Sequence, residues 1–193
     1  MVHISTSISS SCLSLDSWSG MYVGCRWATE QELPPEQWQF KVHHGPLCQM
    51  VILSAHHLVE LMLFQCLHQL LDAMPGKFPK HEKYFSKRLI FNDAFKKWPI
   101  ELTGKNFDLT TEPFKSASAL HLRRNATIHK DSALASLAMS RSALYSAVQA
   151  SRAICEQLLG PSSFVYEKVL ANYPIQDAPW FSEVKYLERF KNS

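Results

Sequence analysis

The feature that most limits the fold of this chain is the unbroken run from Leu47 to Met74. It contains neither glycine nor proline, whereas Pro46 precedes it and Pro75-Gly76 follows it. Proline suits the first turn of a helix, and a Pro-Gly pair ends one. The run therefore predicts a single helix of roughly seven turns. Its apolar residues spread around much of the circumference, which indicates a helix at the centre of a bundle.

A helix of this length and composition could instead cross a membrane. Ionisable side chains occupy its middle, and they are His56, His57, Glu60 and His68. Such groups are costly to place at membrane depth. We therefore interpret the run as a core helix and expect no contact with a membrane.

Two further patterns predict the helices that follow. Lys80 to Trp98 is amphipathic with a basic exposed face, and Pro99 is expected to stop it. A third helix is expected to begin near Pro113, because Thr110, Thr111 and Glu112 offer capping groups just before it. This third helix would run into residues 124–129.

The last third of the chain predicts three more helices. Ala133 to Leu159 is rich in alanine and leucine and is closed by Gly160-Pro161, with Asp131-Ser132 as a candidate cap. Shorter helices are expected at Ser163 to Tyr173 and at Pro179 to Lys191.

Residues 1 to 45 lack a comparable periodicity. They are rich in serine at first, and aromatic residues then alternate irregularly with polar ones around Pro34-Pro35, which suggests extended chain or a short strand. The expected fold is all-α. It comprises an antiparallel four-helix bundle over residues 46–160, an N-terminal irregular or short-strand arm over residues 1–45, and extra C-terminal helices over residues 161–193.

Composition narrows the class of protein further. With 46% hydrophobic and 19% charged residues the chain is of ordinary globular type. Its five cysteines are scattered without a C-x-x-C pair, which predicts neither disulfides nor a cysteine-based zinc site and fits a reducing cytoplasm. The first residues lack a basic stretch followed by an apolar run, so no secretory signal is expected. A net charge of +3 and a pI near 8.6 permit contact with nucleic acid without demanding it.

Cationic, amide and imidazole groups gather in residues 120–132, whose sequence is LHLRRNATIHKDS. Arg124 offers a permanent charge with a planar fork of donors suited to phosphate, and His129 can titrate near neutral pH. Asn125 is an amide that can orient either neighbour. Phosphodiester cleavage needs a positive clamp beside an acid or base, because charge builds up at phosphorus while a proton moves.

The segment from Arg124 to His129 (RNATIH) resembles the R-N-x-x-x-H signature of the HEPN superfamily. Its context agrees, because the signature precedes a long final helix, and residues 55–63 (AHHLVELML) resemble the family's first long helix with its acidic residue. The resemblance covers about residues 46–160. It implies a helical bundle that cleaves RNA without metal or other cofactor, at a site shared across a homodimer to which both protomers contribute Arg and His.

The resemblance also implies roles for the three motif residues. Arg124 would hold the phosphate, His129 would move the proton of the ribose 2'-hydroxyl or of the leaving oxygen, and Asn125 would orient them. The product would be a 2',3'-cyclic phosphate. Many relatives are toxins or defence effectors of prokaryotes, which makes a nucleotidyltransferase-like antitoxin a possible partner.

Two other functions stay open at this point. The first is a non-catalytic helical module that dimerises or binds a partner protein or nucleotide. The second, DNA binding, lacks a recognisable recognition helix. Arg124 and His129 would then be surface groups near a helix junction, with Arg124 paired to Asp131.

On a regular helix Arg124 and His129 would point in different directions. Arg124 and His129 are five residues apart, which on an ideal helix separates them by about 140° around the axis. A bend, a helix end or a second protomer is therefore needed to bring both to one phosphate.

Nearby residues are candidates for supporting roles. Glu60 follows His56 by four residues and His57 by three, so its carboxylate can reach either imidazole. The order H-H-x-x-E matches neither zincin pattern, so we expect no metal site and assign Glu60 and His57 to core hydrogen bonding or support of the motif. Arg123 is expected to be a solvated charge or a secondary RNA contact, and His121 to be structural.

Overall fold

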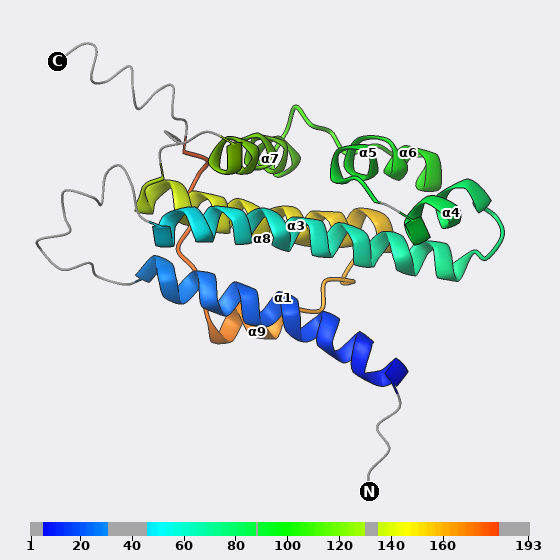
Figure 1. Ribbon diagram of the computed structural model, residues 1–193, viewed down its shortest axis with the longest axis horizontal. Coiled ribbons are helices and arrows are strands. Elements are labelled where there is room, and N and C mark those ends of the chain that lie inside the picture. The colour runs from blue at the N-terminus through cyan, green and yellow to red at the C-terminus, as the bar shows by residue number, and fades with distance from the viewer. Residues whose placement is uncertain (1–5, 31–45, 88, 130–134, 182–193) are drawn as a thin grey trace, which may run out of the picture.

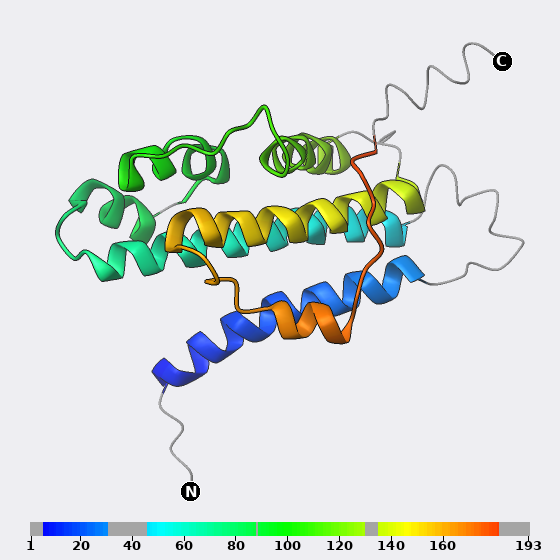
Figure 2. The ribbon, with the colours of Figure 1, turned by 180° about the vertical axis from the view of Figure 1, so that it is seen from behind.

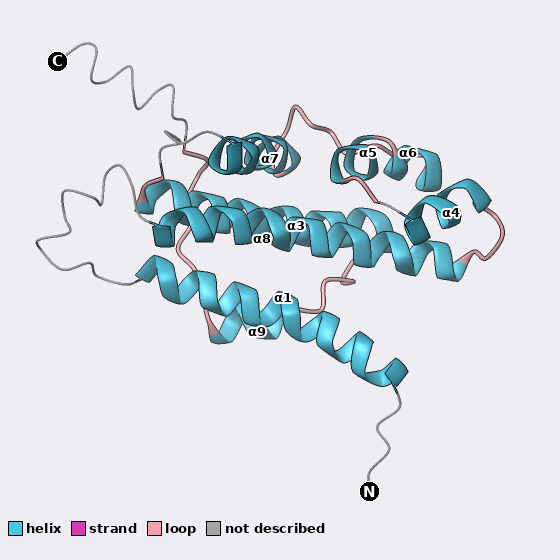
Figure 3. Cartoon of the chain, in the orientation of Figure 1, coloured by secondary structure: helices cyan, strands magenta, loops and turns pink. Residues whose placement is uncertain are grey.

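The computed structural model describes residues 6–30, 46–87, 89–129 and 135–181, excluding the side chains of residues 6–16, 46, 86, 87 and 129. Every regular element in these ranges is a helix, and no strand occurs there (Figures 1 and 3). The expected all-α class is confirmed.

Helix α3 (Pro46–Ala73) lies at the centre, as predicted, and contacts α1, α7 and α8. Ile52, Leu58, Leu63 and Leu67 are completely buried along it. By length and composition alone, Leu47–Ala73 could also cross a membrane, but half of its most apolar stretch is buried inside the protein. Such burial is the property of a core helix.

Helix α8 (Leu137–Leu159) lies beside α3 and runs in the same direction. Near the start of both helices the Ser140 hydroxyl donates to the carbonyl of Cys48 at 3.1 Å, and near their ends the sulfurs of Cys66 and Cys155 are 3.4 Å apart. The expected antiparallel bundle is therefore wrong for this central pair. The buried face of α8 carries the small residues Ser140, Ala143, Ser146, Ala147 and Ala150, which allow the two backbones to approach closely.

The parallel arrangement results from the chain between α3 and α8, which returns to the starting end of α3 (Figure 1). Three short helices begin the return: α4 (Pro79–Lys87), α5 (Phe91–Lys96) and α6 (Trp98–Thr103). The single helix expected from Lys80 to Trp98 is therefore wrong. Pro99 lies in the first turn of α6 instead of stopping a helix, a position that proline favours.

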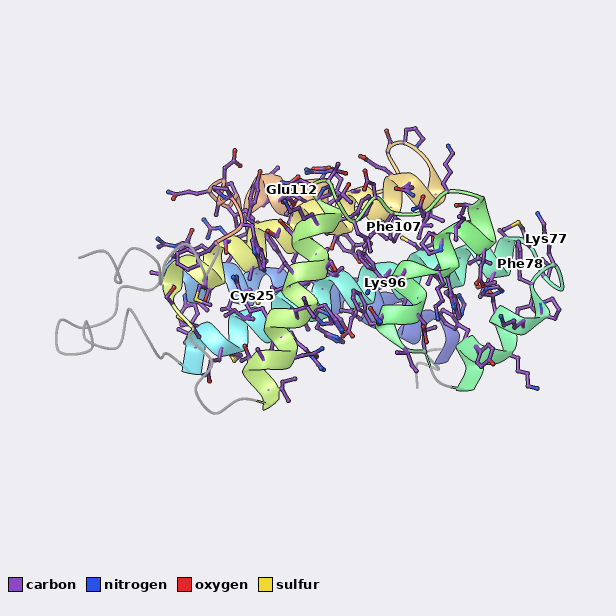
Figure 4. The ribbon with its side chains drawn as sticks, turned by 90° about the horizontal axis from the view of Figure 1, so that it is seen from above. Cys25, Lys77, Phe78, Lys96, Phe107 and Glu112 are labelled. Carbon is purple, nitrogen blue, oxygen red and sulfur yellow. The ribbon has the colours of Figure 1, made fainter. Side chains whose placement is uncertain are left out.

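Helix α7 (Phe114–His129) completes the return and confirms the predicted third helix. The Glu112 carboxylate caps it by accepting from the backbone N–H of Ser116 at 3.2 Å. Seen from above, α7 crosses α3 and α8 steeply instead of lying along them (Figure 4).

Helix α8 ends at Leu159, as predicted. At its start, Ser136 is the N-cap, and its side chain accepts from the backbone N–H of Met139 at 3.2 Å. The caps expected at Asp131-Ser132 lie outside the described residues.

Helix α1 (Thr6–Glu30) replaces the irregular or short-strand arm expected there. It packs against α3 and α8 through a buried face that contains Trp18, Tyr22 and Cys25, which follow helical spacing. Tertiary packing on this face outweighs the weak helical preference of its many serines. The rest of the expected arm, residues 31–45, lies outside the described part of the chain.

Helix α9 (Glu167–Asn172) confirms the short helix expected near residues 163–173. It lies against α1, and residues 173–181 then run from α1 past α8 to α7 (Figure 2). We call residues 173–181 the strap. Most of the helix expected at Pro179 to Lys191 lies outside the described residues.

Candidate active site

Arg124 and Asn125 lie in the C-terminal half of α7, and both are partly buried. The Arg124 guanidinium donates from Nη1 to the Asn125 side-chain oxygen at 3.0 Å. The two motif residues therefore interact directly.

Asn125 continues into a row of polar side chains that reaches α3. Its side-chain nitrogen Nδ2 lies 3.2 Å from Nε2 of His121, one turn earlier on α7. The other ring nitrogen of His121, Nδ1, lies 2.9 Å from Nε2 of His56 on α3. Nδ1 of His56 lies 3.6 Å from the Glu60 carboxylate. We call Arg124, Asn125, His121, His56 and Glu60 the polar row.

The row passes from solvent into the core. His56 is buried, with 1% of its surface exposed. The buried ring of Phe91 on α5 covers both histidines, stacked on His121 at 5.0 Å between centroids and edge-on to His56 at 4.7 Å. The apolar ring therefore packs against both imidazoles, of which His56 is buried and His121 is partly exposed.

Glu60 is the anionic end of the row. Burial alone would raise the pKa of its carboxyl, but hydrogen bonds and charge from His56 and His57 outweigh it and lower the pKa to about 2. The carboxylate is therefore ionised at neutral pH. His57, whose side chain is 50% exposed, reaches the same Glu60 oxygen at 3.3 Å from the solvent side.

The His121 ring is held in the neutral form. Burial lowers its pKa first, and electrostatic interactions with His56, Arg124 and Lys96 lower it further, whereas Glu60 acts in the opposite direction. A neutral imidazole has one donor and one acceptor nitrogen, which suits a position between two polar neighbours.

His129 is the last residue of α7, and its side chain lies outside the described part. Helix α7 continues unbroken from Arg124 to His129, so no bend brings the two together. A helix end and a second protomer are therefore the two remaining ways to bring Arg124 and His129 to one phosphate.

Arg123 differs from its neighbour and from the solvated charge or RNA contact expected for it. It is 7% exposed, its guanidinium lies 3.9 Å from the centre of the Trp180 ring, and it donates to the carbonyl of Phe181. The expectation is wrong because α7 turns Arg123 toward the strap. Arg123 is an anchor between α7 and the strap.

Two histidine contacts were not predicted from the sequence. His56 and His121 are 65 residues apart, and His81 on α4 meets the Glu101 carboxylate of α6 at 2.6 Å across 20 residues. Neither spacing carries a local signal. The contact of His121 with Asn125 spans four residues on one helix and was open to prediction, because such pairs share a helix face.

Metal ligation has no support among the described residues, where no group of three or more His, Cys, Asp or Glu side chains is placed to hold an ion. Glu60 and its two histidines form hydrogen-bonded or ion-paired contacts instead.

Comparison with known proteins adds no name to this geometry. No protein-family model matches the chain, and searches of curated proteins and of solved structures find no match either.

Proposed function

We propose that this chain is a HEPN-like, metal-independent endoribonuclease that acts as a homodimer in the cytoplasm, as a toxin or defence effector. The observation that carries the proposal is the Arg124–Asn125 contact on the helix that ends at His129. This contact uses one N–H donor of the Arg124 guanidinium, and Arg124 is partly buried. The remaining donors of the guanidinium can bind a phosphate.

Each motif residue then has a chemical task. Arg124 holds the scissile phosphate and balances the charge that develops on its oxygens. His129 takes the proton of the ribose 2'-hydroxyl or gives one to the leaving oxygen. The 2'-oxygen attacks phosphorus, the bond to the 5'-oxygen breaks, and a 2',3'-cyclic phosphate and a 5'-hydroxyl end result.

A second protomer supplies what one helix cannot. Arg124 and His129 lie about 140° apart around the axis of α7, so two α7 helices facing each other would bring Arg and His from both chains to one phosphate. Leu122 and Ile128, on either side of the motif pair, are 68% and 46% exposed. Exposed apolar side chains of this size favour a contact surface on α7.

The same exposed side chains also support the alternative function, a non-catalytic module that dimerises or binds a partner, such as a nucleotidyltransferase-like antitoxin, or a nucleotide. Such a module would need no organised guanidinium, and the Arg124–Asn125 contact favours catalysis over it.

Cleavage of RNA by the purified protein in the presence of a chelator tests the proposal. We expect Arg124→Ala and His129→Ala each to lower the rate by about a hundredfold or more, as loss of a charge-stabilising donor or a general acid or base does. Lys115→Ala is the matched control, because Lys115 is an exposed cation on the same helix. It should cleave like the wild type.

The products give an independent readout. A single 2'-deoxy nucleotide at the cleaved position should block cleavage there, and the fragments should carry 2',3'-cyclic phosphate ends. Wild-type protein that leaves RNA intact, or motif variants as active as the wild type, would contradict the proposal. Stable capture of a partner without cleavage would favour the alternative.

A further inference from the structure

The ends of the polar row determine where its protons lie. A guanidinium can only donate hydrogen bonds, and an ionised carboxylate can only accept them. Arg124 therefore faces the oxygen of the Asn125 amide, at 3.0 Å, and the amide must turn its NH2 toward His121. At the opposite end the Glu60 carboxylate favours a proton on the nearer nitrogen of His56, which is Nδ1.

The middle of the row satisfies both ends with one proton on each ring. His121 accepts from Asn125 at Nε2, so its proton is on Nδ1, and it donates to Nε2 of His56 across 2.9 Å. His56 then carries its own proton on Nδ1, 3.6 Å from the Glu60 carboxylate. Each neutral ring has one donor and one acceptor, and every donor points from Arg124 toward Glu60.

Burial fixes the inner part of the row. His56 is 1% exposed, and Phe91 packs against both rings. Nδ1 of His56 lies 3.6 Å from the Glu60 carboxylate, an ion-pair distance, and has no hydrogen-bond partner among the described residues. A buried polar atom without a partner is costly, so a proton on Nδ1 is best placed facing the carboxylate.

We propose that His121 and His56 are positioning residues, which form a one-directional relay of hydrogen bonds from Arg124 to His56, with the Glu60 carboxylate beside its inner end, and thereby hold the Arg124 guanidinium for the phosphate. The effect on cleavage rests on the proposed function, whereas the direction of the relay does not.

The relay requires both rings to be neutral. A second proton on His121 would put an N–H at Nε2 against the Asn125 NH2, donor against donor. Asn125 would then turn its amide and present NH2 to Arg124, which cannot accept. The titratable and charged groups around His121 are Glu60 and His56 of α3, Lys96 of α5 and Arg124 of its own helix, with His57 beyond Glu60. Protonation of His121 in acid should therefore free the Arg124 guanidinium from Asn125, and this effect does not pass through His129.

Histidine-detected NMR of the wild-type protein, labelled with nitrogen-15, tests the direction of the relay near neutral pH. The signals of His56 and His121 are assigned by their loss in His56→Gln and His121→Gln. We expect both rings to carry the proton on Nδ1, the form that a free imidazole side chain populates less. A proton on Nε2 of His121 would overturn the relay, whether or not the protein cleaves RNA.

Cleavage kinetics test the positioning role. Glutamine at position 121 keeps an acceptor near Nε2 and does not titrate, so His121→Gln should retain activity within about tenfold and lose part of the acid limb of the pH profile. His121→Leu should lower kcat by about a hundredfold with a smaller change in KM, because a misplaced clamp costs about that much.

The control is His68→Gln, because His68 is an exposed histidine of α3 that pairs with Asp72 away from the row. It should match the wild type. A folded His121→Leu protein with wild-type kcat and pH profile would overturn the positioning role. Wild-type protein without any cleavage would instead contradict the proposed function, and the NMR result would still decide the relay.

Discussion

Arg123 and Arg124 are neighbours in the chain with opposite surroundings. Arg123 is buried against Trp180 and donates to the strap, whereas Arg124 is partly exposed and contacts Asn125. Successive residues of a helix point about 100° apart, which is enough to divide the pair between the interior and the surface. Two adjacent arginines therefore differ in role by position alone.

Arg123→Ala should destabilise the protein by about 2 kcal/mol, because it removes a stacked guanidinium and a charged hydrogen bond. Arg124→Ala should change the free energy of unfolding by less than about 0.5 kcal/mol, as substitutions outside the core usually do. Chemical denaturation measures both. Equal stability of the two variants would contradict the assignment of Arg123 as an anchor.

Sequence patterns were sufficient to propose the local part of the candidate site but not the contacts it makes with remote residues. Arg124 and Asn125 were identified because their chemistry and spacing lie within one short motif. The His56–His121 contact depends on how α7 crosses α3, which no local pattern of either helix encodes. Periodicity predicts that a helix buries a face, and it does not say which residue of another helix meets that face.

Helix α1 is the element that sequence patterns concealed. Its apolar positions are few and separated by serines, so its amphipathic character is weak. Three large aromatic rings nevertheless gather on its buried face. Trp18 stacks on Tyr22 of the same helix and on Tyr166, the residue just before α9, with ring centroids 5.5 and 4.3 Å apart. A few large side chains can replace a continuous stripe as the source of packing energy.

Two tryptophans of α1 provide a matched test of its packing. Trp18 is completely buried and Trp27 is 61% exposed. We expect Trp18→Ala to cost about 3–5 kcal/mol of folding free energy and Trp27→Ala to cost much less, about 0.5 kcal/mol. Urea denaturation provides the measurement. Similar losses for both would show that α1 is not held by this face.

Helices α3, α7 and α8 were predicted closely because caps and breakers mark their ends. Pro46, Glu112 and Gly160 each lie at or beside such an end. The stretch from 79 to 103 has Pro99 in the first turn of α6 but no glycine or proline in residues 80–98, and its aromatic residues Phe91, Phe95 and Trp98 all turn inward. The chain folds into three short helices to bury them.

For the molecule as a whole, α7 is the outer layer over α3 and α8 (Figure 1). Within the described part of the chain this helix carries exposed apolar side chains, which suit the contact with a second copy that the proposed homodimer requires. Leu122 is the most exposed large apolar side chain of α7.

Leu122→Asp should weaken self-association by about tenfold or more, because a charge at an apolar contact is costly to desolvate. Cleavage should fall with it if the site is shared. Val165→Asp is the matched control, since Val165 is also 68% exposed but precedes α9 on another part of the molecule. Sedimentation at several concentrations measures the association, and an unchanged Leu122→Asp dimer would exclude this surface as the interface.

The strap connects distant parts of the molecule. The Tyr22 hydroxyl of α1 donates to the carbonyl of Tyr173, and burial raises the pKa of Tyr22 to about 12, which keeps it protonated as a donor. Arg26 donates to the carbonyl of Pro174 at 2.7 Å, and Arg123 holds Phe181. The strap is therefore tied to α1 at one end and to α7 at the other.

This connection has a mechanical consequence. The carbonyl of Phe181 accepts from Arg123 of α7, one residue before the guanidinium proposed to hold the phosphate. A displacement of the strap would therefore act first on the helix that carries the motif.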